Sequence, residues 1–209
     1  MRREYMHKEI LTDAQVKLLP IIAKFKNDFG LVGGTAIAFH IGHRESIDFD
    51  MFSPGGFKNA GIRNTFARAS MPISEVYTDE TGQFTFVVDG VQVTFYQFAY
   101  PIDYSEPCDS FAKMPSLLTL AAMKAFALGQ RAKWKDYVDV YFILRDHYSI
   151  EDISACASQL FGGEFNAKLF RQQLHFFDDI NYKEQVVFMP GFEVPEEEIK
   201  QALKNYSTA

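Results

Sequence analysis

Two aspartates one residue apart, with two glycines upstream of them, are the residues of this chain best suited to chemistry. The stretch LVGGTAIAFHIGHRESIDFDMFS, residues 31–53, contains Gly33, Gly34, Asp48 and Asp50. On a strand, side chains two residues apart point to the same side, so Asp48 and Asp50 would present two carboxylates together. Such carboxylates repel each other unless a cation lies between them or one keeps its proton. The pair therefore predicts Mg²⁺, which proteins commonly hold by one or two carboxylates plus substrate phosphates.

The glycines and the elements around them suit a phosphate ligand. A turn without side chains lets backbone N–H groups approach phosphate oxygens, and a helix that starts there adds its positive dipole end. We expect a buried strand before the glycines, a helix at residues 35–43 capped by Thr35 and ended by Gly42, and a strand at residues 46–52 with Phe49 in the core. An Asp-x-Asp pair alone is usually solvated, and a Gly-Gly pair alone is often only a turn. Their order along the chain, which is strand, Gly-Gly, helix and Asp-x-Asp strand, favours a functional site.

Composition places the chain among ordinary folded proteins. It has 209 residues, of which 47% are hydrophobic and 23% charged. The net charge of −6 does not indicate nucleic-acid binding by the surface as a whole. No apolar stretch is long enough to span a bilayer, and the only cysteines, Cys108 and Cys156, have no metal-type or disulfide-framework spacing. We expect a reduced, cytoplasmic protein.

The pattern along the chain predicts an α/β (α+β) fold in two parts. After a helix near residues 59–70, three β-branched and aromatic segments form a meander, with Asp89-Gly90 as a hairpin turn between the last two. From Ser116 onward the segments are helical. We therefore expect a mixed sheet with flanking helices over residues 1–114, and a helical region that completes the cleft over residues 115–209.

The residue 31–53 stretch resembles the signature of the AbiEii/AbiGii-type nucleotidyltransferases, which are toxins of abortive-infection and toxin–antitoxin systems. These belong to the polymerase-beta-like nucleotidyltransferase superfamily. The resemblance continues at AAMKAFALGQRAKWKDYVDVYFIL and covers roughly residues 29–145. It implies that Gly33, Gly34 and Thr35 hold nucleotide phosphates while Asp48 and Asp50 carry the catalytic Mg²⁺.

The later motif adds charged candidates. Lys124 lies in an otherwise apolar helix; it could snorkel to solvent, or, as the resemblance implies, contact the triphosphate. Asp136 and Asp139 share one helix face and could pair with Arg131 or Lys135. The resemblance implies that Lys124, Lys135, Asp136 and Asp139 line the nucleotide site.

One expected acid is missing. Nucleotidyl transfer in this superfamily generally uses a third carboxylate on a later strand, which helps to hold a second metal and activates the attacking hydroxyl. The matching position here is Thr94, which cannot act as a base at neutral pH. Glu75 and Asp103 are weak substitutes.

Three functions remain open at this point. The first is Mg²⁺-dependent transfer of a nucleoside monophosphate from a nucleoside triphosphate to an RNA or protein hydroxyl, by a possible toxin with a cognate antitoxin. The second is a weakened relative that binds nucleotide without transferring it, and the third is a phosphotransferase that moves only the terminal phosphate. Transfer RNA is the acceptor that related proteins suggest.

Overall fold

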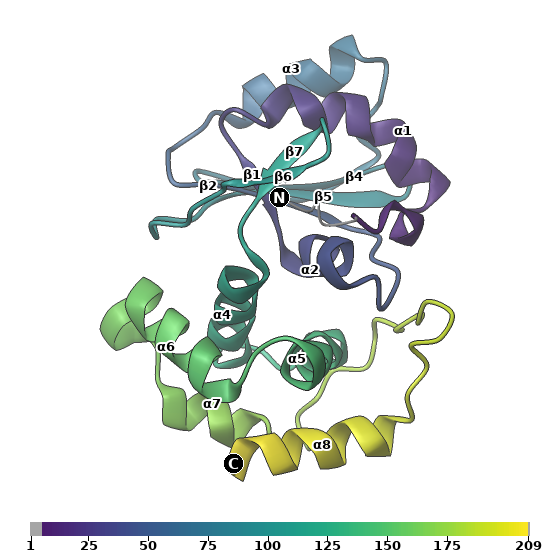
Figure 1. The fold of residues 1–209 in the computed structure, drawn as a ribbon. Coiled ribbons are helices and arrows are strands. Elements are labelled where there is room, and N and C mark those ends of the chain that lie inside the picture. Colours follow the sequence, from purple (N-terminus) through teal and green to yellow (C-terminus); the bar gives the residue numbers. More distant parts are fainter. Residues whose placement is uncertain (1–5, 209) are drawn as a thin grey trace. The chain divides into compact units, whose positions relative to one another are not determined.

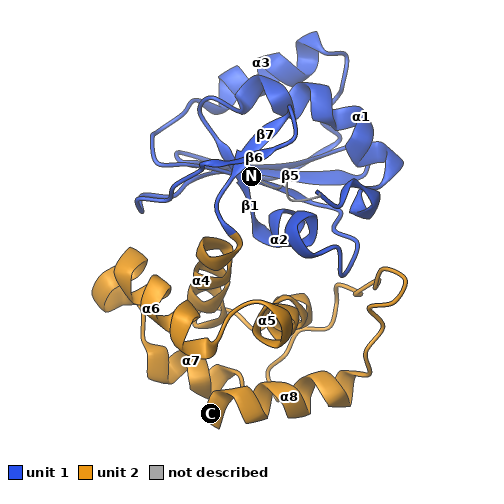
Figure 2. Ribbon diagram, in the orientation of Figure 1, with its two compact units in different colours: residues 1–116 blue, residues 117–209 orange. Residues whose placement is uncertain are grey.

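The computed structural model describes residues 6–208. They form two compact units, and the boundary between the units lies after Ser116 (Figures 1 and 2). The first contains the sheet and the second is helical, which confirms the predicted fold class. No helix within the described range is long and apolar enough to cross a membrane.

The first unit is built on a five-stranded mixed sheet in the order β1-β2-β5-β4-β3. Its strands are β1 (Gly30–Val32), β2 (Phe49–Ser53), β3 (Glu75–Glu80), β4 (Gln83–Val88) and β5 (Val91–Gln97). β2 and β5 are parallel, whereas the other neighbouring pairs are antiparallel. The predicted meander is thus β3-β4-β5, and its last strand lies beside the strand that carries Asp50.

One face of this sheet holds the core. Phe49, Met51, Phe84, Phe86 and Phe95 are fully buried. The helices on that side are α1 (Asp13–Ile22), the short 3₁₀ turn η2 (Ala23–Phe25) and α3 (Asn59–Arg68) (Figure 1). Because side chains alternate along a strand, burial of Phe49 and Met51 turns Asp50 to the other face, where α2 (Gly33–Ile41) lies.

Two predicted turns are confirmed. Asp89 and Gly90 both have positive φ, 49° and 77°, between strands paired up to Val88 and Val91, as a two-residue hairpin loop requires. Gly42 ends α2 in the left-handed conformation with φ 75°. In both places a glycine takes a backbone conformation that side-chain-bearing residues adopt at a cost.

Several short elements were not predicted from the sequence. These are the two-stranded ribbon β6 (Glu106–Cys108) and β7 (Ala112–Met114), and the 3₁₀ turns η1 (Lys8–Ile10), η2 and η3 (Gly162–Glu164). Three residues are too few to show a hydrophobic period, so no sequence pattern announces them.

The second unit consists of helices, as predicted for the chain from Ser116 onward. They are α4 (Leu117–Leu128), α5 (Trp134–Asp146), α6 (Ile150–Phe161), α7 (Ala167–Gln173) and α8 (Glu196–Thr208). α6 begins with a capping box, in which the Ser149 side chain accepts from the Asp152 N–H and the Asp152 side chain accepts from the Ser149 N–H. α4 contacts α5, α6 and α7, which explains why it is apolar almost throughout.

Candidate active site

The glycine turn connects β1 to α2. The helix starts at Gly33 itself, two residues earlier than predicted, and Val32 at its N-cap makes no side-chain capping bond. Gly33 has φ 71°, and a Cβ atom there would lie 2.2 Å from Oδ2 of Asp50. The backbone of the turn and the Asp50 carboxylate therefore approach each other more closely than any side chain at position 33 would permit.

Thr35 has a different role from the predicted one. It does not cap the helix; its hydroxyl donates to the backbone carbonyl of Asp48 and lies 2.8 Å from the Ser46 hydroxyl. Thr35 is 2% exposed and Ser46 7%, so these contacts are sheltered from water. The correction has a physical reason: the residue is already inside the helix, and a buried hydroxyl takes the nearest buried acceptor. Thr35 thus fastens the glycine helix to the segment carrying Asp48.

A buried arginine adjoins the second glycine. A Cβ atom on Gly34 would lie 2.5 Å from Nη2 of Arg44, whose side chain is 3% exposed. Nη1 of Arg44 donates to the Glu45 carbonyl at 2.9 Å. The turn is consequently bordered by the Asp50 carboxylate at Gly33 and by the Arg44 guanidinium at Gly34.

The aspartate pair straddles the start of β2. The strand begins at Phe49, so Asp48 precedes it, whereas the sequence predicted both acids within one strand. Asp50 is paired in register with Val32 on β1 and with Thr94 on β5. Asp50 is held by two neighbouring strands, and the backbone carbonyl of Asp48 accepts a hydrogen bond from the Thr35 hydroxyl.

The register puts Thr94 beside Asp50, at the position assigned to the third acid. Its hydroxyl is paired with that of Thr85 at 3.4 Å. Glu75 lies on β3, which β4 and β5 separate from β2, and Asp103 is exposed in the loop before β6. Within residues 6–208 no group of three or more His, Cys, Asp or Glu side chains is arranged to hold a metal ion.

In the second unit, Lys124 forms a buried ion cluster. Its Nζ lies 2.7 Å from Oδ1 of Asp136 and 3.1 Å from Oδ2 of Asp139, and Nε of Arg131 lies 3.2 Å from Oδ2 of Asp136. Both acids are 0% exposed and Lys124 is 6% exposed, so the snorkelling alternative is wrong. Burial tends to raise the pKa of Asp136, but the charges of Lys124 and Arg131 outweigh it and lower the pKa.

Lys135 belongs to a separate cluster. It pairs with Glu184, and so does Lys133, at 2.5 Å. Partial burial tends to raise the pKa of Glu184, but the two lysines outweigh it and lower the pKa to about 2. These contacts fasten the loop before α8 to the start of α5.

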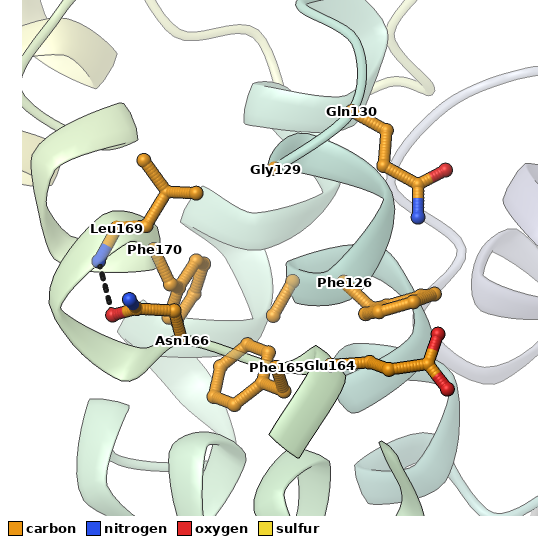
Figure 3. A pocket seen from close by; sticks show the side chains of 9 residues that line it. Phe126, Gly129, Gln130, Glu164, Phe165, Asn166, Leu169 and Phe170 are labelled. Atoms are coloured by element: carbon orange, nitrogen blue, oxygen red, sulfur yellow. Dashed lines mark hydrogen bonds between the residues drawn. The ribbon is translucent and has the colours of Figure 1, made fainter. Parts of the chain in front are cut away.

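A cavity of about 70 Å³ lies between α4, η3 and α7, lined largely by Phe126, Phe165, Leu169 and Phe170 (Figure 3). Beside it, the Asn166 side chain accepts from the N–H of Leu169 at 3.0 Å. Ligand pockets for small molecules usually measure roughly 300–1,000 Å³, so this cavity is too small for a nucleotide. None of the predicted site residues lines it.

Comparisons with known proteins agree with this fold. A protein of Aquifex aeolicus (strain VF5), named uncharacterized protein aq_aa25, is 27% identical over 185 residues, which cover 86% of this chain and 88% of that protein. A crystal structure of a putative nucleotidyltransferase from H. pylori has a TM-score of 0.60 at 12% identity, with 94% of this chain and 92% of that one covered. MenT4, the nucleotidyltransferase toxin Rv2826c from Mycobacterium tuberculosis H37Rv, has a TM-score of 0.58 at 11% identity, covering 93% and 81%.

The fold is thus that of the nucleotidyltransferases. The family described as nucleotidyl transferase AbiEii toxin, Type IV TA system, matches residues 21–206. The chain belongs to this family of toxin–antitoxin nucleotidyltransferases, as the stretch from Leu31 to Ser53 predicted.

Proposed function

We propose that this protein transfers a nucleoside monophosphate from a nucleoside triphosphate to a hydroxyl of an RNA acceptor, with pyrophosphate as the leaving group. The observation that carries the proposal is the contact between the glycine turn and Asp50, 2.2 Å from the position of a Gly33 Cβ. Backbone N–H groups at a helix start bind phosphate oxygens, and a carboxylate beside them binds the cation that phosphates bring.

Asp48 and Asp50 would hold Mg²⁺. The donors fit, because hard carboxylate oxygens and substrate phosphates are the ligands this ion prefers, and two protein carboxylates suffice for such a site. The ion would supply charge neutralisation for the phosphates at the reacting centre. Gly33 and Gly34 offer backbone N–H groups to the triphosphate, and Thr35 positions the Asp48 segment through the bond to its carbonyl.

The four predicted site residues of the second unit lie in two ion clusters. Lys124, Asp136 and Asp139 form one buried unit, in which the ammonium is neutralised by two carboxylates. Arg131 is held by Asp136 at its Nε while its side chain is 53% exposed. Lys135 lies in the other cluster, with Glu184. We keep the assignment of Lys124, Lys135, Asp136 and Asp139 to nucleotide binding as part of the proposal, as the resemblance implies.

The position of Thr94 favours a second candidate, a relative that binds nucleotide but transfers it slowly or not at all. Thr94 occupies the register position of a third acid, and a threonine hydroxyl is no general base at neutral pH. Substitution of Asp50 distinguishes the two functions. It should abolish nucleotidyl transfer in an enzyme, but it should only weaken nucleotide binding in a protein that does not transfer.

Calorimetric titration of each ribonucleoside triphosphate tests the site itself. Wild type should bind at least one triphosphate with Mg²⁺ and much more weakly without it, and Asp48→Ala/Asp50→Ala should lose the Mg²⁺-dependent part. Asp89→Asn serves as the control, because Asp89 lies in the β4-β5 turn, where it forms an exposed 3.9 Å pair with Lys17. Wild type that binds no triphosphate would overturn the proposal.

The family is one of toxin–antitoxin systems, which supports a cognate antitoxin for this chain. We propose that the two proteins are made together and act in the cytoplasm. Co-expression tests this: growth arrest by wild type should be relieved by the partner and should be absent with Asp50→Asn. Arrest that persists in Asp50→Asn would place toxicity outside nucleotidyl transfer.

A further inference from the structure

The sheet face that carries Asp50 continues into aromatic side chains. Phe52 follows Asp50 by two residues on β2, and Tyr96 follows Thr94 by two on β5, so all four side chains share one face. Phe52 and Tyr96 are themselves partners in register. The aromatic pair therefore stands about 6–7 Å along the strands from the Asp50–Thr94 pair.

These two rings contact each other and are not part of the main core. The ring centroids of Phe52 and Tyr96 lie 5.2 Å apart at an interplanar angle of 54°, and Phe98 supports Phe52 at 5.2 Å. Tyr96 is 36% exposed and Phe52 is half-buried, whereas Met51 and Phe95 on the opposite face are fully buried. Exposed, adjoining aromatic surface beside a reaction site is a feature of binding surfaces.

We propose that Phe52 and Tyr96 form a stacking platform for an unpaired base of the RNA acceptor. This inference rests on the proposed function, because it names where the acceptor binds. Aromatic side chains bind single-stranded nucleic acid by base stacking, which contributes separately from the electrostatic attraction of a basic groove. A chain with net charge −6 gains little from long-range attraction to RNA, so stacking is the contribution it can make.

The strand directions place the acceptor, and not the donor nucleotide, on this platform. β1 is antiparallel to β2, with Val32 opposite Asp50 and Gly30 opposite Phe52. The glycine turn after Val32 therefore lies toward the Asp48 end of β2, and the platform lies on the other side of Asp50. In phosphoryl transfer the attacking and leaving oxygens are roughly in line. With the triphosphate at the glycines, the attacking hydroxyl comes from the platform side.

A neighbouring amide adds a polar contact. Gln83 on β4 is paired in register with Tyr96 and shares its face. Its side-chain amide can both donate to and accept from a base edge. The platform thus offers stacking from the two rings and a hydrogen bond from Gln83 that different bases can accept or donate.

Fluorescence anisotropy with a short, unstructured, labelled oligoadenylate, without nucleotide or Mg²⁺, tests the platform separately from transfer. Phe52→Leu and Tyr96→Leu should each weaken RNA binding roughly 5- to 100-fold, and Tyr96→Phe should bind as wild type does. Tyr77→Leu is the matched control, since Tyr77 is 61% exposed on the outer strand β3. Melting temperatures establish that each variant is folded. Because Tyr96 is already 36% exposed, Tyr96→Leu carries the test if Phe52→Leu does not fold.

The outcomes separate this inference from the proposed function. Wild-type RNA affinity in Tyr96→Leu, or an equal loss in Tyr77→Leu, would overturn the platform even if transfer occurs. Weaker triphosphate binding by the leucine variants in calorimetry, with RNA binding intact, would assign the rings to the donor base and overturn it too. Transfer to a protein hydroxyl by a chain that binds no RNA would have the same consequence. Loss of RNA binding in the leucine variants supports the platform, whatever the turnover.

Discussion

Gly33 and Asp50 lie so close together that a methyl group on the glycine would meet the carboxylate. The distance from a Gly33 Cβ to Oδ2 of Asp50 would be 2.2 Å, and Gly33 has φ 71°. Two independent constraints, the left-handed backbone and the close approach, therefore fix glycine at this position. The chain holds a backbone turn and an acid together at the place where the account puts phosphate and metal.

Gly33→Ala should abolish Mg²⁺-dependent triphosphate binding, because the methyl group must displace the Asp50 carboxylate. Gly90→Ala is the matched control: Gly90 has φ 77°, but a Cβ there would meet nothing within 4 Å. Both variants should lose about 1–2 kcal/mol of unfolding free energy from the backbone conformation alone. Calorimetry and urea unfolding measure the two effects; undiminished triphosphate binding by Gly33→Ala would contradict the geometry of the site.

Lys124→Ala should destabilise the second unit by about 3–5 kcal/mol, because it leaves two buried carboxylates without their cation. Lys168→Ala, at an exposed lysine of α7, should change stability by less than about 0.5 kcal/mol. Adding Asp136→Asn and Asp139→Asn to Lys124→Ala should recover part of the loss, since the uncompensated charges are gone. Urea unfolding measures all of these. A stable Lys124→Ala that only binds triphosphate more weakly would show that the lysine serves the ligand alone.

Thr94→Asp should create the third carboxylate beside Asp50. Neighbouring strands lie about 4.8 Å apart, so the added charge should lower the melting temperature without Mg²⁺ and make it rise more steeply with Mg²⁺ than in wild type. If wild-type turnover is limited by the missing base, the variant should turn over roughly 100-fold faster. Thr78→Asp, two strands farther from Asp50 on β3, should show neither effect. Equal Mg²⁺ responses in the two variants would contradict the assignment of Thr94.

The carboxyl of Glu184 should titrate near pH 2 in an NMR titration, since Lys133 and Lys135 lower its pKa to about 2. A folded-state pKa below the unfolded value means that the pairing stabilises the protein above about pH 4.3 and is lost as pH falls toward 2. In Lys133→Met/Lys135→Met only the opposing effect of burial remains, so the pKa should rise to its ordinary value or above. An unchanged titration in that variant would contradict the pairing.

Local features were predictable from the sequence, whereas partners distant along the chain were not. Gly42, Asp89-Gly90 and the burial of Phe49 follow from turn chemistry and strand alternation, which act over a few residues. The cluster of Lys124 with Asp136 and Asp139 joins residues of two helices, and neither helix's period identifies the partner on the other.

The bonds between the proposed site residues were not predictable from the sequence. Thr35 was assigned to capping, and its bond to the Asp48 segment depends on where the helix begins, which sequence patterns locate only within a few residues. Ser46, which completes that contact, carried no signal beyond being a polar residue near Asp48. The position of Thr94 was predictable because alternation and a parallel neighbour fix the register once the strands are known.

The fate of the α-phosphate distinguishes nucleotidyl transfer from transfer of the terminal phosphate. Wild type is incubated with Mg²⁺, RNA and a triphosphate labelled either at the α- or at the γ-phosphate, alongside Asp50→Asn and the Asp89→Asn control. We expect that the α-label enters RNA with release of unlabelled pyrophosphate, that the γ-label does not enter, and that only Asp50→Asn is inactive. Entry of the γ-label would show a phosphotransferase, and α-label in RNA with Asp50→Asn as active as wild type would contradict the site.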